Sequence, residues 1–542
     1  MYISSLLIQN YRTFQQVTFR FDSRMNYIVG DNNIGKSNLL QLLKSVTHGE
    51  GFREKDFLDA EQPIEIQMTL ADKEESPRET LHLKLVQRVQ EVVPRLWDMD
   101  SGKQLPLEYM RCLFYMNVGL FEVPRNMLHD SLGSEILQLF EQYFASSPTA
   151  GVHLGKLLEK EGFVLQFYEN NPRQCAIQLF HAIFGSSTLL SSSYNTTPCL
   201  MIAIGAVLLA KMKEKKKSRA ISFENMVTVD EKGKRWLSMM VSIDEPELHL
   251  HPYLQRALLS YIRAILNNEE PFFLQMVQSV LGVDGLDGQL FVVTHSTDSL
   301  VNDYRQIIRL YWDETDRVQA ACGVAFHFNQ EIEKHLIMHF PEVKEALYSR
   351  CTILVEGETE YGSFGYFAKT LGVHLDYHGI CLINARGESS IAKIAQLLRR
   401  FHIPAVCLYD RDVMGSHAKQ ENIFYTDYVC YEMDVVQACL SSGGRKILDQ
   451  VIAEMDENGD TVNSALIKKA GAKLGVPKGF YPPKKLKNIN PRDRNALEFY
   501  YFAWLYGNKG VIIGRALGEY LTEKEIPKAF ANAIRGAVTL AK

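Results

Sequence analysis

The sequence lacks several patterns that would decide its class at once. Its nine cysteines are scattered, with no Cys-x-x-Cys pair and no cluster with histidine, which argues against a zinc site and against a disulfide framework. It has no basic excess either, because the formal net charge is −5 over 542 residues. Binding of nucleic acid would therefore require a local basic surface. The cysteine usage suits a reducing cytoplasm.

Long apolar runs are also missing. The longest, Cys199 to Ala210, is too short to span a bilayer, and we interpret it as a buried helix. No basic lead precedes an apolar stretch at the N-terminus, so we expect no signal peptide. The composition, 46% apolar and 23% charged, is typical of globular domains, and the length allows about two to four of them. We interpret the charged run Lys211 to Arg219 as a solvated helix end.

Apolar periodicity in the first half predicts a sheet-rich unit. Residues 1–20 indicate two antiparallel strands around a turn, and residues 64–70 alternate as a further strand. Residues 100–184 carry poor strand signals and predict a helical insertion. Two later apolar strands end near Ile243 and Thr294, and their separation by helices favours a largely parallel sheet.

A second unit is expected to begin near Ser349. From there strands and helices alternate in the order β-α-β-α-β up to the segment PAVCLYDRD, which predicts another parallel sheet. In such sheets catalytic groups gather at the carboxyl ends of the strands. The domain boundary is therefore expected between residues 345 and 346.

The segment GDNNIGKS, residues 30–37, fits the phosphate-binding pattern G-x-x-x-x-G-K-[ST]. Gly30 and Gly35 would let the backbone wrap around a phosphate group, and the following helix would add its positive N-terminal dipole. Lys36 would reach the terminal phosphates, and Ser37 would offer a hydroxyl group to Mg²⁺. Since a strand precedes this loop and a helix follows it, the sequence predicts a nucleotide site.

A second part of such a site follows a later strand. Asp244 and Glu245 come directly after Val241 to Ile243, which close an apolar strand. Adjacent carboxylates at a strand end suit two tasks, because Asp244 would hold the Mg²⁺ shell and Glu245 would polarise water toward the γ-phosphate. His295 follows another buried strand and is a candidate sensor of the γ-phosphate. For Asp244 and Glu245, the alternative interpretation is a solvated acidic turn after the strand.

A separate group of acidic residues lies in the second half. Glu356 ends one strand, Glu360 follows four residues later, and Asp410 and Asp412 follow another strand, whose continuation would direct both aspartates to one side. Four carboxylates repel one another unless a cation neutralises them, and such a set suits Mg²⁺ or Mn²⁺ rather than zinc. The residues predict a two-metal site for phosphodiester cleavage, with a pair of solvated loops as the alternative.

The motifs of the first half resemble the ABC-type ATPase heads of RecF, SMC and OLD proteins, and the lack of a long coiled coil disfavours SMC. The resemblance implies ATP sites completed by a second head, with Ser192 approaching the partner's γ-phosphate from a signature segment. Ser193 stands where the family usually has glycine, and a serine-rich helix cap is the alternative. The implied nucleotide-binding residues are Gly30, Asn33, Gly35, Lys36, Ser37, Asn38, Asp244, Glu245, His295 and Ser192.

The acidic motifs EGETE and DRD resemble those of Toprim domains. An ABC-type head followed by a C-terminal Toprim domain is similar to OLD family nucleases, including the Gabija nuclease and the OLD effectors attached to some retrons. The resemblance implies an α/β fold. An ABC-type ATPase domain, residues 1–345 with a helical insertion at about 100–184, would precede a Toprim domain, residues 346–542, built on a parallel sheet with a C-terminal helical extension.

The same resemblance implies further site residues. The segment DYVCYEMDVV contributes Glu432 as another acid, with Asp434 as the alternative, and GNKGVIIGRAL places Lys509 at the site. An ammonium group there would neutralise charge that develops on the scissile phosphate, although on its own Lys509 equally fits a surface lysine. The implied catalytic and metal-binding residues are Glu356, Glu360, Asp410, Asp412, Glu432 and Lys509, together with Glu245, Asp244 and Ser37 at the nucleotide site.

The activity implied by the resemblance is ATP-regulated DNA cleavage with Mg²⁺ or Mn²⁺ in phage defence. It further implies a homodimer or larger assembly through the ATPase domain, a partner such as a helicase or a retron complex, and no membrane. The basic segment Lys478 to Arg494 would contact phosphates, with Phe480 or Tyr481 stacking a base, or would form a charged surface loop. The rivals are a RecF-like DNA-binding scaffold with an inactive Toprim domain, and a topoisomerase, for whose gating domain the chain offers no space.

Overall fold

The computed structural model describes most of the chain, in two compact units, Met1–Phe326 and His327–Lys542. The described residues are 1–71, 80–118, 131–146, 171–184, 197–218, 223–247, 251–300, 303–415, 422–455, 462–476 and 484–542. The boundary expected between residues 345 and 346 lies at the end of helix α9 (Gln330–Ala346), which belongs to the second unit. In the described part, no helix is long and apolar enough to cross a membrane.

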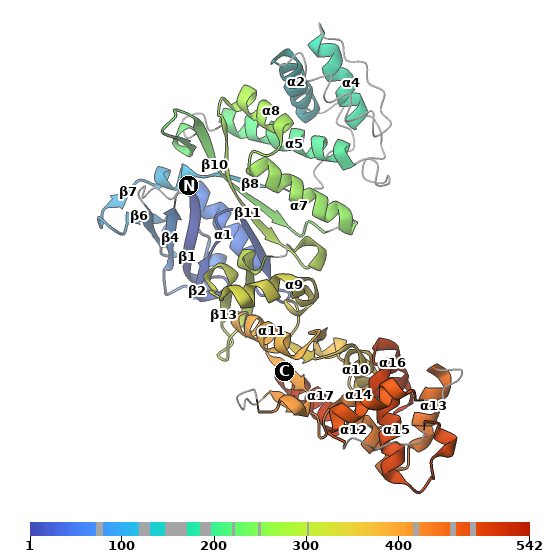
Figure 1. The fold of residues 1–542 in the computed structure, drawn as a ribbon. Coiled ribbons are helices and arrows are strands. Elements are labelled where there is room, and N and C mark those ends of the chain that lie inside the picture. Colours follow the sequence, from blue (N-terminus) through green and yellow to red (C-terminus); the bar gives the residue numbers. More distant parts are fainter. Residues whose placement is uncertain are drawn as a thin grey trace. The chain divides into compact units, whose positions relative to one another are not determined.

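An antiparallel sheet of order β2-β1-β4-β5-β6-β7 forms one layer of the first unit (Figure 1). Its strands are β1 (Tyr2–Tyr11), β2 (Phe14–Arg20), β4 (Ile64–Ala71), β5 (Leu81–Gln87), β6 (Arg95–Asp98) and β7 (Gln104–Leu105). Every second residue of β4 is buried, as expected for a sheet with one face on the core. The hairpin predicted for residues 1–20 is confirmed, with Tyr11 opposite Phe14 at the turn.

A second sheet, of order β13-β12-β3-β11-β10-β8, carries β9 beside β10. Its strands are β3 (Met25–Val29), β8 (Phe114–Asn117), β9 (Val227–Val229), β10 (Arg235–Asp244), β11 (Gly285–Val293), β12 (Ile307–Trp312) and β13 (Val318–Cys322). From β8 to β12 all neighbours run parallel, and the apolar runs of β3 and β11 are buried, as predicted for a covered parallel sheet. Parallel pairing brings the ends of β3, β10 and β11 to one edge.

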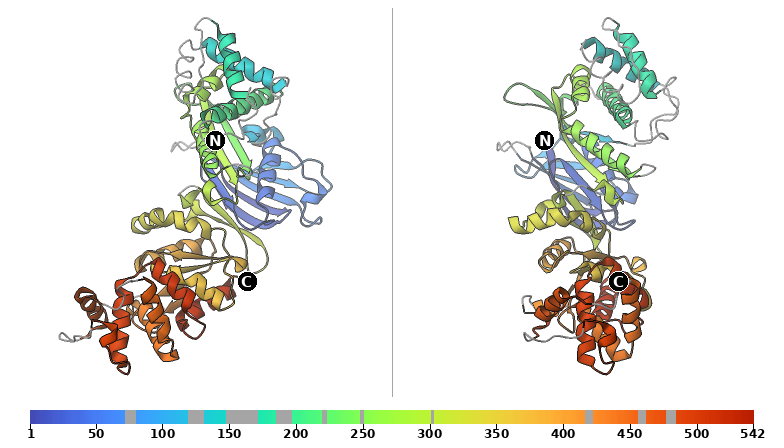
Figure 2. Two further views of the ribbon diagram at one scale, coloured as in Figure 1. Left: turned by 90° about the vertical axis from the view of Figure 1, so that its right-hand side faces the viewer. Right: turned by 45° about the vertical axis from the view of Figure 1, so that its right-hand side comes forward.

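Helix α1 (Lys36–His48) lies between the two sheets. Its Leu39 and Leu43 share one buried cluster with Leu6 and Phe14 of the antiparallel sheet and Phe291 of the parallel sheet. Figure 2 shows the helices coloured green over the parallel sheet, and α7 and α8 contact β11. The bounds of these two helices are Pro252–Leu266 for α7 and Pro271–Leu281 for α8, and the described helices α2 (Ser131–Ser146), α4 (Pro172–Phe184) and α5 (Thr197–Ser218) pack against them and against one another. Because β3 and α1 are both packed in these layers, the position of the loop that joins them is fixed.

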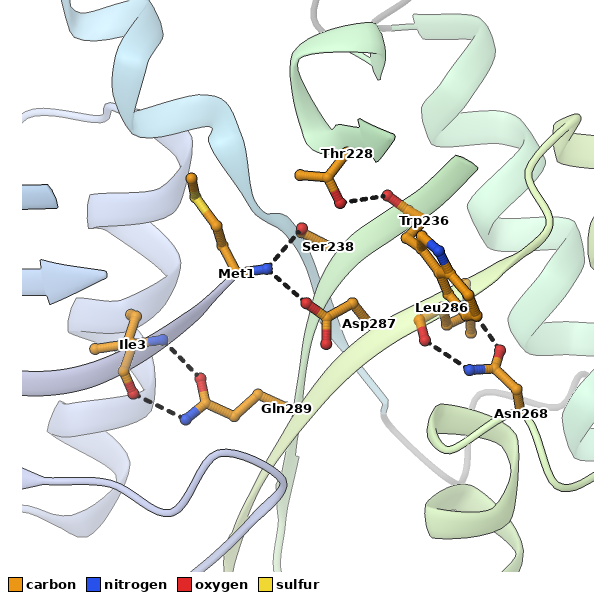
Figure 3. A network of polar contacts seen from close by, with 9 residues as sticks. All are labelled: Met1, Ile3, Thr228, Trp236, Ser238, Asn268, Leu286, Asp287 and Gln289. Atoms are coloured by element: carbon orange, nitrogen blue, oxygen red, sulfur yellow. Dashed lines mark hydrogen bonds and ion pairs between the residues drawn. The ribbon is translucent and has the colours of Figure 1, made fainter. Parts of the chain in front are cut away.

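A polar network ties the two sheets together where they meet (Figure 3). The buried side chain of Gln289 in β11 donates to the carbonyl oxygen of Ile3 at 2.9 Å and accepts from its N–H at 3.1 Å. The α-ammonium group of Met1 lies 2.5 Å from Asp287 and donates to Ser238 at 3.2 Å. Because buried backbone groups need partners, these contacts hold β1 in register against the parallel sheet.

Two expectations for the first unit are wrong in part. The region 100–184 contains strands β7 and β8 within its first residues, and β8 pairs with the core strand β10; a four-residue strand is too short to show periodicity. The charged run at the end of α5 is not simply solvated, because Lys215 donates to the carbonyl of Tyr115 at 2.9 Å and Lys216 to that of Leu281 at 2.6 Å. Long lysine stems allow such contacts at a buried helix end.

The second unit is built on a parallel sheet of order β15-β14-β16-β17. Helices α9 and α11 contact one another over this sheet, and α10 and α17 form a second contacting pair. Further helices, coloured orange to red in Figure 1, extend the unit. The elements are β14 (Cys351–Val355), β15 (Ile380–Asn384), β16 (Ala405–Tyr409), β17 (Ile423–Tyr425), α10 (Glu358–Thr370), α11 (Glu388–Arg400), α12 (Tyr431–Ser442), α13 (Arg445–Met455), α14 (Ser464–Leu474), α15 (Arg494–Gly507), α16 (Val511–Tyr520) and α17 (Lys528–Leu540).

Candidate functional site

The loop between β3 and α1 has the geometry of a tightly wrapped turn. Gly30 and Gly35 have φ angles of 145° and 114°, and Asn33 has a φ of 63°. A Cβ atom on Gly30 would lie 2.6 Å from the carbonyl oxygen of Leu310, and one on Gly35 would lie 2.4 Å from Oγ1 of Thr13. Both glycines are therefore required by backbone conformation and by close approach.

Lys36 begins α1 and turns back over the loop. Its Nζ donates to the carbonyl oxygens of Gly30 at 2.9 Å and Asp31 at 2.7 Å. Burial lowers the pKa of Lys36, against the opposing effect of Asp31, Glu245 and Asp244. The ammonium group is thus held among loop carbonyls and faces the carboxylates that follow β10.

The next two residues of α1 differ in their surroundings. Ser37 is exposed at the helix N-terminus, where a hydroxyl group can meet a ligand. Asn38 instead donates to Oγ1 of Thr13 at 3.2 Å and accepts from Arg12 at 3.0 Å. In this structure Asn38 therefore ties the helix to the β1–β2 turn.

The acids after β10 lie beside the residue that follows β11. The backbone N–H of Glu245 donates to the carbonyl of Val293 at 2.9 Å, and Glu245 has a φ of 49°. Oε1 of Glu245 lies 3.6 Å from Nε2 of His295, and Asp244 is exposed. Together with Lys36, these side chains occupy one edge of the parallel sheet, where the sequence predicted a nucleotide site.

Glu247 completes this edge and was missed by the sequence interpretation. Its carboxylate accepts from Oγ1 of Thr294 at 2.8 Å and from the backbone N–H of His295 at 2.5 Å. The side chain fixes the turn that carries His295. The signal was present in the acidic run DEPE, but a carboxylate three residues after Asp244 looks like an ordinary turn residue. The proposed signature residue Ser192 lies outside the described residues.

The acidic site of the second unit forms at the carboxyl ends of β14 and β16. A cavity of about 310 Å³ there is lined by Glu356, Gly357, Glu358, Thr359, Glu360, Gly387, Asp410, Lys509 and Gly510. Glu356 follows β14 directly, and Glu360 lies in the first turn of α10. A Cβ atom on Gly357 would lie 2.7 Å from Oε2 of Glu360. A larger residue at this position would therefore clash with the carboxylate of Glu360.

Glu360 and Asp410 of this cavity are buried, Glu356 is partly buried, and the three are close enough to repel one another. Burial, then Glu432, raises the pKa of Glu360 to about 7. Burial, then Glu360 and Glu432, raises the pKa of Asp410 to about 8. Burial and Asp412 also raise the pKa of Glu356. The cavity thus favours protonated acids or a bound positive charge.

Lys509 supplies a positive charge within the cluster. Its Nζ lies 2.8 Å from Oε1 of the buried Glu432. Burial alone would lower the pKa of Lys509, but Glu432 and Glu360 overcome it and raise that pKa. The alternative acid, Asp434, accepts from the backbone N–H groups of Asp427 at 2.9 Å and Tyr428 at 2.7 Å. The structure therefore places Glu432 beside the cavity, whereas the Asp434 side chain holds the turn that precedes α12.

The two aspartates after β16 point to different partners, contrary to the expectation of a continuing strand. The chain turns into a 3₁₀-helix at Arg411–Val413. Oδ1 of Asp410 accepts from the N–H of Tyr431 at 3.1 Å, whereas Asp412 forms an ion pair with Lys473 of α14. Lys473 was missed, because nothing in the sequence shows that α14 reaches the end of β16.

A third strand end adds another acid that was missed. Glu388 begins α11, after a short loop that follows β15, and contributes to the raised pKa of Glu356, behind burial and Asp412. The signal was the acid after the strand GICLIN. Of the basic segment Lys478 to Arg494, Phe480 and Tyr481 lie outside the described residues, and α15 begins at Arg494.

Whether these residues fit a divalent cation depends on their donor atoms. In the part of the chain that is described, no three or more histidine, cysteine, aspartate or glutamate side chains already converge as a metal site. Two buried carboxylate oxygens, Oε2 of Glu356 and Oε2 of Glu432, have no hydrogen-bond partner within that part. Carboxylate oxygens are the ligands that Mg²⁺ and Mn²⁺ prefer. The donor set therefore fits a hard divalent cation that would relieve its repulsion.

Family models match both units. Residues 347–412 match the TOPRIM domain described as overcoming lysogenization defect (OLD) protein-like. Residues 1–93 match the model described as AAA ATPase domain, and residues 229–302 match the model described as AAA domain, putative AbiEii toxin, Type IV TA system. The resemblance that the motifs indicated is thereby confirmed at the level of an ATPase head followed by an OLD-like Toprim domain.

Individual proteins match shorter or more distant parts. DNA replication and repair protein RecF of Leptospira interrogans serogroup Icterohaemorrhagiae serovar copenhageni (strain Fiocruz L1-130) is 39% identical over 56 residues, 10% of this chain and 15% of that protein. The C-terminal region of the Burkholderia pseudomallei OLD protein covers 36% of this chain and 100% of its own, with 21% identity and a TM-score of 0.24. The structure of the SmcHead bound to the C-winged helix domain of ScpA covers 59% of this chain and 97% of its own, with 12% identity and a TM-score of 0.28.

Proposed function

We propose that this chain, which joins an AAA ATPase domain to an OLD-like Toprim domain, is an ATP-regulated DNA endonuclease that depends on Mg²⁺ or Mn²⁺. The observation that carries the proposal is the cavity at the ends of β14 and β16, where Glu356, Glu360, Asp410 and Lys509 meet. Buried carboxylates with raised pKa values, beside an ammonium group, are the charges that two-metal phosphodiester cleavage uses.

In this proposal the carboxylates of Glu356, Glu360, Asp410, Asp412 and Glu432 hold the divalent cations. Bound Mg²⁺ or Mn²⁺ supplies the activation of water and the stabilisation of the leaving oxygen. Lys509 lines the cavity and lies 2.8 Å from Glu432, so that its ammonium group neutralises charge developing on the scissile phosphate. Glu360, Asp410 and Glu432 are buried, and exclusion of water around these three carboxylates strengthens their electrostatic effect.

The nucleotide is proposed to bind the loop of residues 30–37. Lys36 would exchange the carbonyl oxygens of Gly30 and Asp31 for the phosphates, while Ser37 and Asp244 hold Mg²⁺. Glu245 would polarise the attacking water, and His295, 3.6 Å from it, would sense the γ-phosphate. ATP would then set the state of the first unit and thereby control the nuclease.

The setting of this activity follows from the resemblance to OLD nucleases. We propose a cytoplasmic homodimer or larger assembly formed through the ATPase domain, residues 1–345, which acts in defence against phage. A helicase or a retron RNA/DNA complex is the proposed partner. The Toprim domain, residues 346–542, would carry the cutting site.

A RecF-like, ATP-dependent DNA-binding scaffold with an inactive Toprim domain is the second candidate. It is favoured by the match to RecF over 56 residues. The two candidates differ in cleavage, because a scaffold binds DNA and ATP without hydrolysing phosphodiester bonds.

The direct test incubates the purified chain with supercoiled plasmid and Mg²⁺ or Mn²⁺, with and without ATP. The proposal expects nicked or linear products with free ends, and none in EDTA. Intact DNA at all cation concentrations, together with ATP-dependent DNA binding, would favour the scaffold. A ladder of closed topoisomers would indicate a topoisomerase.

Glu245→Gln is expected to bind ATP normally but to hydrolyse it about 100-fold more slowly, because a positioned general base contributes roughly 10²–10⁴ to such a step. The measurement is phosphate release under saturating ATP beside ATP affinity by calorimetry. Glu231→Gln removes an exposed carboxylate from the same unit and should leave both values unchanged. Wild-type turnover by Glu245→Gln would assign the base to another residue.

A further inference from the structure

Helix α14 presents two lysines to the acidic site. Lys473 forms an ion pair with Oδ2 of Asp412. Lys469, one turn earlier, lies with its Nζ 5.1 Å from the ring centroid of Tyr506, and Nζ of Lys509 lies 4.6 Å from the same centroid. Residues four apart share one face of a helix. The face of α14 that carries both lysines therefore extends from Tyr506, which Lys509 also contacts, to the carboxylate of Asp412.

The surroundings of this face are strongly basic. The described residues from 462 to 494, which omit 477–483, contain one acidic residue, Asp493. Their basic residues are Lys468, Lys469, Lys473, Lys484, Lys485, Lys487, Arg492 and Arg494. Lys469 and Lys473 thus belong to a basic stretch of a chain whose net charge is −5, and such a local excess of positive charge attracts a phosphate backbone to one place.

The ion pair between Lys473 and Asp412 is not buried, and this makes it exchangeable. The side chain of Asp412 is 39% exposed and that of Lys473 is 21% exposed. Solvent screens pairs of this kind, so they contribute little to folding. Asp412 is also one of the carboxylates proposed to hold a divalent cation. While Lys473 occupies it, a cation must compete with an ammonium group for the same oxygens.

We propose that Lys469 and Lys473 bind the DNA phosphates beside the scissile bond, and that Lys473 leaves Asp412 when it does so. DNA would thus free a cation ligand, and the cation would in turn free the lysine for DNA. Binding of DNA and binding of the divalent cation then favour each other, and by linkage the effect is the same in both directions. This inference rests on the proposed function, because it assumes that DNA reaches the cavity.

The first test measures binding of a fluorescent 30-base-pair duplex to the full chain by anisotropy, with Ca²⁺ or EDTA, over a series of salt concentrations. Lys473→Ala should weaken binding about tenfold and lower the slope of log K against log[salt] by about one, the value for one lost phosphate contact. Lys469→Ala should act in the same direction. Lys524→Ala removes the same charge from an exposed position of the same unit, outside residues 462–494, and should change binding less than twofold.

The second test needs no DNA. Binding of Mn²⁺ to the free chain, followed by electron paramagnetic resonance, should be about three- to tenfold tighter in Lys473→Ala, because Asp412 is no longer occupied. Lys473→Arg keeps the charge and should retain wild-type behaviour in both tests, which separates loss of the contact from loss of the fold. Ca²⁺ should increase duplex affinity in the wild type more than in Lys473→Ala.

The outcomes distinguish this inference from the proposed function. If the wild type cuts plasmid while Lys473→Ala keeps the wild-type salt slope and Mn²⁺ affinity, the inference is wrong and the nuclease assignment stands. If the wild type neither binds duplex nor cuts plasmid, both are wrong. A lower slope together with tighter Mn²⁺ binding in Lys473→Ala supports the coupling.

Discussion

Plasmid cleavage by Asp410→Asn is expected to fall by about a thousandfold or more, while ATP binding and hydrolysis stay near the wild-type values. Loss of one carboxylate ligand removes several kcal/mol of charge stabilisation from a metal-assisted transition state, and each 1.36 kcal/mol corresponds to about tenfold in rate. The fold should survive, because an asparagine oxygen can still accept from the N–H of Tyr431, now 3.1 Å from Oδ1. The readout is plasmid cleavage beside phosphate release on the same preparation.

The control for this substitution is Asp376→Asn, which removes an exposed carboxylate from the same unit and should cut like the parent. Glu356→Gln should behave like Asp410→Asn. Duplex binding by Asp410→Asn is expected to be equal or tighter, because residue 410 can then no longer ionise beside Glu360 and Glu432 and repel a phosphate. Cleavage by Asp410→Asn at the parental rate would make the acidic cluster structural and favour the RecF-like scaffold.

The nucleotide loop was accessible to sequence reasoning because its constraints are local. Gly30, Gly35 and Lys36 lie within seven residues, and each is required by the turn, by close approach or by the expected phosphate. The acids at strand ends were accessible for a similar reason, since parallel pairing gathers the ends of β14 and β16 at one edge. The side chains that contact each acid could not be predicted from the sequence in this way.

What sequence reasoning missed depends on contacts between distant segments. Asp412 meets Lys473, 61 residues later, and Glu247 holds the N–H of His295, 48 residues later. Neither of these contacts can be predicted from the spacing of apolar and polar residues along the sequence. The choice between Glu432 and Asp434 was open for the same reason, because both lie in the first turn of α12 and only their surroundings distinguish them.

The short strand β8 and the lysines of α5 show a second kind of limit. Four residues of β8 are too few for a periodic signal, and their state is decided by pairing with β10. The lysines at the end of α5 look solvated by composition, yet Lys215 and Lys216 reach carbonyl groups of other elements. Side chains with long apolar stems can be partly buried while their ends find partners.

Lys36→Ala is expected to weaken ATP binding by about 100-fold, because a charge-assisted contact contributes up to about 3 kcal/mol and each 1.4 kcal/mol is roughly tenfold in Kd. Nζ of Lys36 lies 2.9 Å and 2.7 Å from the carbonyl oxygens of Gly30 and Asp31. An ammonium group held there is already placed within the loop that would wrap the phosphates. Isothermal titration calorimetry with ATP and Mg²⁺ gives the Kd values.

Lys44→Ala is the matched control, since Lys44 is exposed on the same helix and its removal should leave ATP affinity unchanged. Both variants should keep the wild-type circular dichroism spectrum, because the core residues of α1, such as Leu39 and Leu43, are untouched. Nuclease control by ATP should be lost in Lys36→Ala even where cleavage itself persists, because the residues proposed to cut DNA lie in the other unit. Wild-type ATP affinity in Lys36→Ala would exclude residues 30–37 as the phosphate site and, with it, the proposed role of Glu245.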